Sequence, residues 1–166
     1  MARAFAEIVK ELGPSDTEYG IIIVHTNSGP KALNFIVGQD GLIAGSQWLE
    51  SLQSNGYTWR DVSSFVHSHN ITEGDDAINQ RNRAPAWSSG NIGDYGIGIY
   101  AQTRAQEQGA NMAAWNSRYS QYIIGPEDYV AREFDGVSPH SSVTDGIFTD
   151  AEANAHEADA NNDCSS

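Results

Sequence analysis

The most constraining segment of the sequence is Phe65-Val66-His67-Ser68-His69, an apolar run that ends in two histidines one residue apart. The run predicts a strand over residues 62–69, and its adjacent apolar side chains indicate burial on both faces of a sheet. Alternate residues of a strand point to the same face, so His67 and His69 would stand side by side, about 7 Å apart along the backbone. The strand end is therefore a candidate metal site, although a bare His-x-His is also compatible with two ordinary polar residues.

Length and composition narrow the class of protein. A chain of 166 residues is long enough for one domain with a buried core. The formal net charge of -13, with only 9 lysines and arginines, opposes binding to nucleic acid or to an anionic membrane. Cys164 is the single cysteine, which excludes an intrachain disulfide and a cysteine-rich zinc ribbon. A bound metal would therefore be held by histidines and carboxylates.

Hydropathy patterning predicts an α/β domain over residues 1–136, followed by an acidic extension over 137–166 that is either helical or weakly structured. No apolar segment approaches the roughly 20 residues of a membrane helix, and the N-terminus does not resemble a signal peptide, so we expect a soluble chain. The expected elements are a helix over 2–12, a hairpin over 19–37 with its turn at 27–30 and its second strand at 33–37, a short helix from 46 to 55, the strand 62–69, a helix from 88 or 89 to about 108, and a hairpin of strands 119–124 and 129–134.

A third metal ligand is expected from the helix that begins near residues 88–94. Asp94 is the only carboxylate there, and a negative charge is favoured at a helix N-terminus. Asn91 lies three residues after Ser88 and is the alternative position, but a neutral amide is a poor zinc ligand. An ordinary charge at a helix start is the competing interpretation of Asp94.

Three further residues can carry chemistry beside such a site. Glu18, just ahead of an apolar strand, is a candidate general base that moves a proton from a metal-bound water to the leaving amine. Ser88 or Ser89 is a candidate donor to the developing oxyanion. The simpler interpretations are a surface carboxylate for Glu18 and a helix N-cap for whichever serine begins the helix.

The order Glu, His-Ser-His, Ser, Asp resembles the JAB/JAMM (MPN-type) metalloproteases, whose pattern is an upstream Glu, then His-x-His, then Ser-x-x-Asp. Glu18-Tyr19-Gly20 is similar to the Glu segment of the JAB-like domains of bacterial polymorphic toxins, and the likeness covers about residues 15–135. Two departures stand out. Asn70 replaces a proline that many relatives have, and the last element is irregular because Ser88-x-x-Asn91 lacks a carboxylate while Ser89 to Asp94 has two extra residues.

The resemblance implies a mixed central β-sheet flanked by helices, with cytidine-deaminase-like layering. It implies that Zn²⁺ is held by His67, His69 and Asp94, with Asn91 as the alternative third position. Glu18 would be the base, and Ser89 or Ser88 would steady the oxyanion. The implied activity is that of a metallopeptidase or isopeptidase that cleaves a peptide, isopeptide or related amide bond.

The resemblance also suggests a biological setting and leaves rival functions. The setting is that of a bacterial toxin or effector domain, delivered by a specialised secretion system, with a protein or peptide substrate and an immunity or delivery protein as partner. One rival is a metal-free MPN-like binding module, which Asn91 would favour. Another is a metal-dependent nuclease, which the net charge of -13 opposes.

Overall fold

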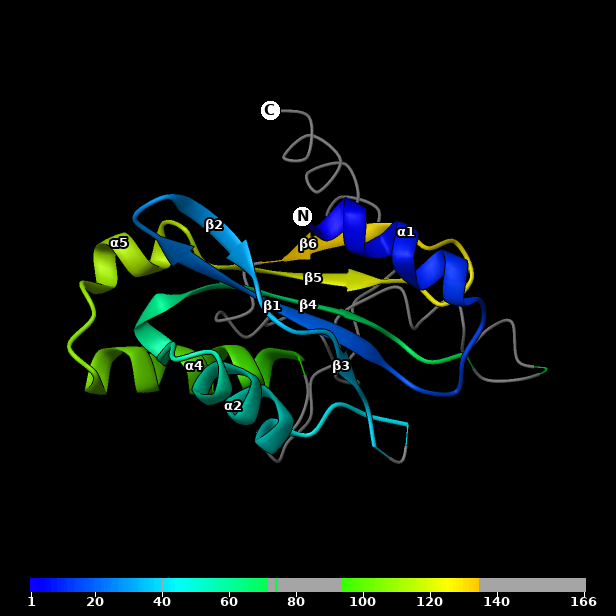
Figure 1. Ribbon diagram of the computed structural model, residues 1–166, viewed down its shortest axis with the longest axis horizontal. Coiled ribbons are helices and arrows are strands. Elements are labelled where there is room, and N and C mark those ends of the chain that lie inside the picture. Colours follow the sequence, from blue (N-terminus) through cyan, green and yellow to red (C-terminus); the bar gives the residue numbers. More distant parts are fainter. Residues whose placement is uncertain (40, 72–73, 75–93, 135–166) are drawn as a thin grey trace, which may run out of the picture.

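Strand β4 (Val62–Ser68) lies inside a mixed β-sheet that has helices on both faces (Figure 1). The computed structural model describes residues 1–39, 41–71, 74 and 94–134. The elements within these residues are α1 (Ala2–Leu12), β1 (Tyr19–Thr26), β2 (Gly29–Ala32), β3 (Ile36–Val37), α2 (Gly45–Ser54), η1 (Trp59–Asp61), β4, α4 (Asp94–Glu107), α5 (Met112–Asn116), β5 (Ser120–Ile124) and β6 (Ala131–Phe134). The strand order is β2-β1-β4-β5-β6, and β3 also pairs with β1, along the same edge as β2.

Strand β4 is paired along both edges and buried on both faces of the sheet, as its apolar run predicted. It runs antiparallel to β1 and parallel to β5, and the β5–β6 hairpin is antiparallel. Phe65 and Val66 are both fully buried and belong to different apolar clusters, one on each face of the sheet. The expected α/β class with a mixed sheet flanked by helices is therefore confirmed.

The first hairpin differs from its prediction in its returning strand. The turn is only Asn27 and Ser28, because Gly29, with φ 109°, already pairs with Thr26. The returning chain is split into β2 and β3, so the expected strand over 33–37 is wrong for residues 33–35. Pro30 is tolerated within β2 because an edge strand has one row of N–H groups that needs no partner in the sheet.

Each face of the sheet has its own core (Figure 1). Helix α1 covers one face, and its periodic apolar residues confirm the predicted amphipathic helix. Helices α2 and α4 cover the other face, together with η1 and α5. The α1 core includes Phe5, Val9, Ile21, Ile23, Val66, Tyr122 and Ile124. The α4 core includes Ile22, Trp48, Trp59, Phe65, Ala101, Ala105 and Trp115.

Two short elements on the α4 side, η1 and α5, were not predicted. Helix α5 has five residues, too few for an apolar period, and the side chain of Asn111 caps it by accepting a hydrogen bond from Ala114 N at 3.2 Å. The indole of Trp115 donates to Trp59 O at 3.1 Å and so joins α5 to η1. Tertiary contacts of this kind stabilise short helices that a sequence pattern does not reveal.

The remaining predictions differ from the structure mainly at element ends. Strand β6 begins two residues later than expected, because Tyr129 adopts a left-handed backbone with φ 57°. The described part of the long helix begins at Asp94, whereas its expected start at Ser88 or Ser89 lies outside the described residues. The predicted loop over 70–87 and the extension over 137–166 also fall largely or wholly outside them.

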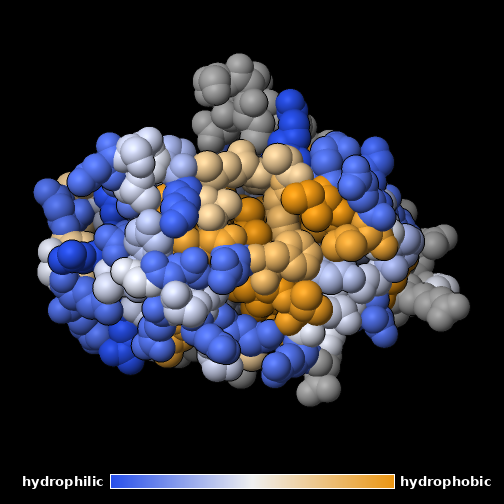
Figure 2. Space-filling model, in the orientation of Figure 1, coloured by the Kyte–Doolittle hydropathy of each residue, from blue (hydrophilic) through white to orange (hydrophobic). Residues whose placement is uncertain are grey.

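Apolar side chains gather on the face of the molecule seen in Figure 2, over β1 and β3 and beside α1. Several residues of these elements and their connections are more exposed than is usual for their type. They are Ile8, Leu12, Phe35, Val37 and Leu42. Among the helices that the structure describes, none combines the length and the apolar character needed to cross a membrane.

Candidate metal centre

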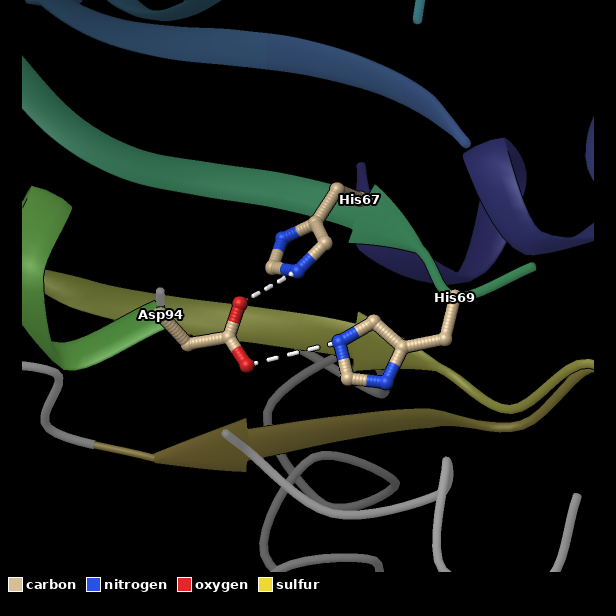
Figure 3. A group of neighbouring side chains, drawn as sticks. All are labelled: His67, His69 and Asp94. Carbon is tan, nitrogen blue, oxygen red and sulfur yellow. Dashed lines mark ion pairs between the residues drawn. The ribbon is translucent and has the colours of Figure 1, made fainter. Parts of the chain in front are cut away.

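Three side chains converge at the end of β4, on the face of the sheet that α4 covers. Nε2 of His67 lies 2.7 Å from Oδ1 of Asp94, and Nε2 of His69 lies 3.3 Å from Oδ2 of the same carboxylate (Figure 3). One ligand atom from each residue can be chosen so that all three lie within 4.8 Å of one another. The carboxylate thus faces both imidazoles at once.

Strand pairing fixes both histidines. His67 lies opposite Gly20 of the antiparallel strand β1 and beside Ile123 of the parallel strand β5. His69 follows the last residue of β4, but its N–H still donates to Ile124 O at 3.0 Å. The backbone therefore remains extended past the strand end, which keeps the two imidazoles on one face as the alternation of a strand predicts. Their ring centroids are 5.1 Å apart.

The packing around His67 depends on a glycine. A Cβ atom on Gly20 would come within 2.6 Å of the indole of Trp48 and of the side chain of Ile43. The missing side chain lets the Trp48 ring approach β1, where it meets His67 edge-on with centroids 6.5 Å apart. Gly20 and Trp48 thus form an apolar wall against the first histidine.

Asp94 comes from a different part of the chain and stands at the described start of α4. A carboxylate in the first turn of a helix is stabilised by the helix dipole. Its own carbonyl oxygen accepts a hydrogen bond from Nε2 of Gln121 in β5, at 2.8 Å. The third member of the group is therefore tied to the sheet through its backbone as well as facing the histidines through its side chain.

The group is nearly sealed from solvent. The side chains of His67, His69 and Asp94 are 7%, 9% and 9% exposed. Burial by itself would raise the pKa of Asp94, but the two imidazoles, His67 before His69, outweigh it and hold that pKa far below its usual range. Asp94 is therefore an ionised carboxylate at neutral pH.

The donor set fits a metal ion. Two imidazole nitrogens and one carboxylate oxygen are ligands that zinc and several other divalent metals accept. Nδ1 of His67 is buried and has no hydrogen-bond partner among the residues that the structure describes, and Nε2 is the ring nitrogen that faces Asp94. The group of His67, His69 and Asp94 can therefore hold a metal ion.

Glu18 is not part of the group of His67, His69 and Asp94. It precedes β1 and is half-buried, and its Oε2 accepts a hydrogen bond from Ile43 N at 3.0 Å. Continuing the β1–β4 register by two residues from the Gly20–His67 pair places Glu18 opposite His69. Opposite residues of antiparallel strands share a face, so the register puts the carboxylate on the side of the sheet that carries the histidines.

The structure places some of the residues predicted from sequence at the metal group, and others lie outside the part of the chain that it describes. Asp94 is beside the histidines, whereas Asn91, Ser88 and Ser89 lie outside the described residues. Gln121 was not singled out from sequence, although a glutamine inside the otherwise apolar end of a buried strand is itself a signal. No pattern in the sequence predicted that Trp48 packs against His67.

Comparison of the chain with models of known protein families, with curated proteins and with solved structures gave no match. The function of the chain is therefore inferred from the pattern of residues along it and from the arrangement of His67, His69 and Asp94 in space.

Proposed function

We propose that the chain is a zinc-dependent hydrolase that cleaves a peptide, isopeptide or related amide bond, with a JAMM-like arrangement of its residues. The observation that carries the proposal is the convergence of two histidines from a strand end and one aspartate from a helix start. The sheet with α1 on one face and α2 and α4 on the other agrees with the layering expected of such a fold.

His67, His69 and Asp94 would hold the metal. Zinc with three protein ligands keeps one position for water and lowers the pKa of that water to about 7. Asp94 contributes the negative charge of the site, and its depressed pKa keeps it in the ligating form. The low exposure of all three side chains limits solvent around them, which strengthens electrostatic interactions within the site.

Glu18 would move the proton. A general base takes a proton from the attacking water and returns it to the leaving amine, and a glutamate side chain serves both steps. The hydrogen bond from Ile43 N fixes the carboxylate through Oε2. Oε1 then accepts and releases the proton, on the face that the register shares with His69.

The proposal extends to substrate and setting. A protein or peptide substrate follows from the amide-cleaving chemistry, and the net charge of -13 opposes a nuclease that uses the same histidines. The likeness to toxin-type JAB domains adds a role as a delivered effector with an immunity or delivery partner. A serine that steadies the oxyanion, Ser88 or Ser89, belongs to the same proposal.

The test incubates the zinc-loaded chain with a library of cell-derived peptides and with isopeptide-linked conjugates, and identifies new termini by mass spectrometry. We expect cleavage by the wild type, no cleavage by Glu18→Gln despite retained zinc, and neither zinc nor cleavage in a His67→Ala/His69→Ala variant. His25→Ala is the matched control, because His25 is exposed on β1 away from the group.

Two results would overturn the proposal. One is a zinc-loaded wild type that generates no new termini from either substrate set. The other is a Glu18→Gln variant that turns over as fast as the wild type.

A further inference from the structure

Gln121 is a polar side chain in a place that otherwise holds apolar ones. It lies in β5 beside Phe65 of β4, and it is fully buried. Its neighbours on this face of the sheet belong to the apolar core under α4. Burying an amide costs free energy unless the amide is hydrogen-bonded, so a glutamine here needs a structural or functional reason.

A hydrogen bond from Gln121 to Asp94 supplies such a reason. Nε2 of Gln121 donates to Asp94 O at 2.8 Å, so the side chain bridges the sheet to the described start of α4. Strand β5 also pairs directly with the strand that carries His67, since Ile123 lies beside that histidine. One side chain thus links the backbone of the aspartate to the strand pair that presents the first histidine.

The start of α4 needs such a link because its sequence has a low helix propensity. Gly96 and Gly98 stand in its first turns, and glycine disfavours a helix relative to alanine. The fully buried alanines of α4, Ala101 and Ala105, come about two and three turns after Asp94. The hydrogen bond from Gln121 therefore adds an anchor at the described start of α4, ahead of these buried residues.

We propose that Gln121 is a positioning residue that sets Asp94 at the correct distance from His67 and His69 for metal binding. The proposal rests on the proposed function, because it takes these three residues as the ligands. Gln121 does not touch the metal; it fixes the backbone of a residue that does. Loss of residues that orient metal ligands typically weakens metal affinity by about 10- to 100-fold.

The first experiment measures zinc affinity by competition with a chromophoric chelator. Gln121→Met keeps the length of the side chain and removes the donor, and we expect zinc to bind about 10- to 100-fold more weakly. Trp115→Phe is the matched control, since it removes another buried hydrogen bond on the same face, from Nε1 to Trp59 O, away from the group. We expect its zinc affinity to remain within about twofold of wild type, while both variants lose stability.

The second experiment needs no metal and separates this proposal from the proposed function. The imidazole signals of His67 are recorded by ¹H–¹⁵N NMR in the metal-free protein, where Nε2 lies 2.7 Å from the Asp94 carboxylate. We expect these signals to shift in Gln121→Met and to remain in place in Trp115→Phe. If the wild type binds no zinc, the proposed function fails and the NMR comparison alone decides the role of Gln121.

Wild-type zinc affinity together with unchanged His67 signals in Gln121→Met would overturn the proposal. Equal losses of affinity in Gln121→Met and Trp115→Phe would also overturn it, because they would show a general effect of stability.

Discussion

The two faces of β4 serve different purposes. Toward α1 the strand presents Val66, which packs against the buried side of that amphipathic helix, and the small buried side chains of Ser64 and Ser68. Toward α4 it presents Phe65 and then His67, an ionisable side chain buried beside an ionised carboxylate. The first face is built for stability. The second accepts buried ionisable groups, which cost free energy unless they are paired, and gains from them a site that can hold a metal.

The largest expected effect is on the α1 face. Phe5 is 2% exposed in the α1 core, so Phe5→Ala should lower the free energy of unfolding by about 3–5 kcal/mol, as for other buried phenylalanines. Urea denaturation of the metal-free protein measures this loss. Zinc affinity of the folded fraction should stay unchanged, and a parallel collapse of affinity would show that the two faces are not separate.

Zinc binding should stabilise the native chain through the α4 face of the sheet only. At a free zinc concentration about 100 times the Kd, binding to the native state adds about 2.7 kcal/mol to the free energy of unfolding. Thermal or urea unfolding with zinc and with a chelator should show this increment in the wild type and in Phe5→Ala. The increment should vanish in His67→Ala/His69→Ala; its persistence there would place the metal elsewhere.

A substitution at Gly20 tests whether Trp48 and Ile43 pack closely against β1 beside His67. A methyl group there would press on Trp48 and Ile43, and overpacking of this kind typically costs about 1–3 kcal/mol. Gly20→Ala should therefore lower stability and change the fluorescence of Trp48. Gly45→Ala is the control, because a Cβ on that residue meets nothing within 4 Å. Equal stability of the two variants would refute the close approach.

The smallest expected effect lies away from both the α1 core and the metal group. Asn111 caps α5, and loss of a cap residue typically costs about 1 kcal/mol. Asn111→Ala should lower the urea midpoint slightly while zinc affinity stays at the wild-type value. A change in zinc affinity would mean that α5 is coupled to the group, contrary to the separation described above.

Patterns of adjacent residues predicted much of this fold. The apolar period of residues 2–12, the β-branched run of β1 and the buried run of β4 each carry their structure locally, and all three elements form as expected. The same local logic placed His67 and His69 side by side, because strand alternation needs no knowledge of the rest of the chain. Helix α5 was missed since its five residues are held by a cap and by the contact of Trp115 with Trp59.

The third candidate ligand could not be chosen from local patterns alone. Asp94 and Asn91 are close in sequence, and the choice depends on where α4 begins and how its first turn meets the sheet. The hydrogen bond from Gln121 joins residues 27 positions apart, so no window of sequence contains it. Glu18 is similar, because Ile43, whose N–H holds its carboxylate, is 25 residues away.

The most direct test of the central claim is the metal content of the purified chain. After zinc supplementation and removal of free metal, elemental analysis of the wild type should give about one zinc ion per chain, and His67→Ala/His69→Ala should give none. A folded wild type that holds no metal, or a double variant that holds as much as the wild type, would contradict the assignment of His67, His69 and Asp94 as a metal centre.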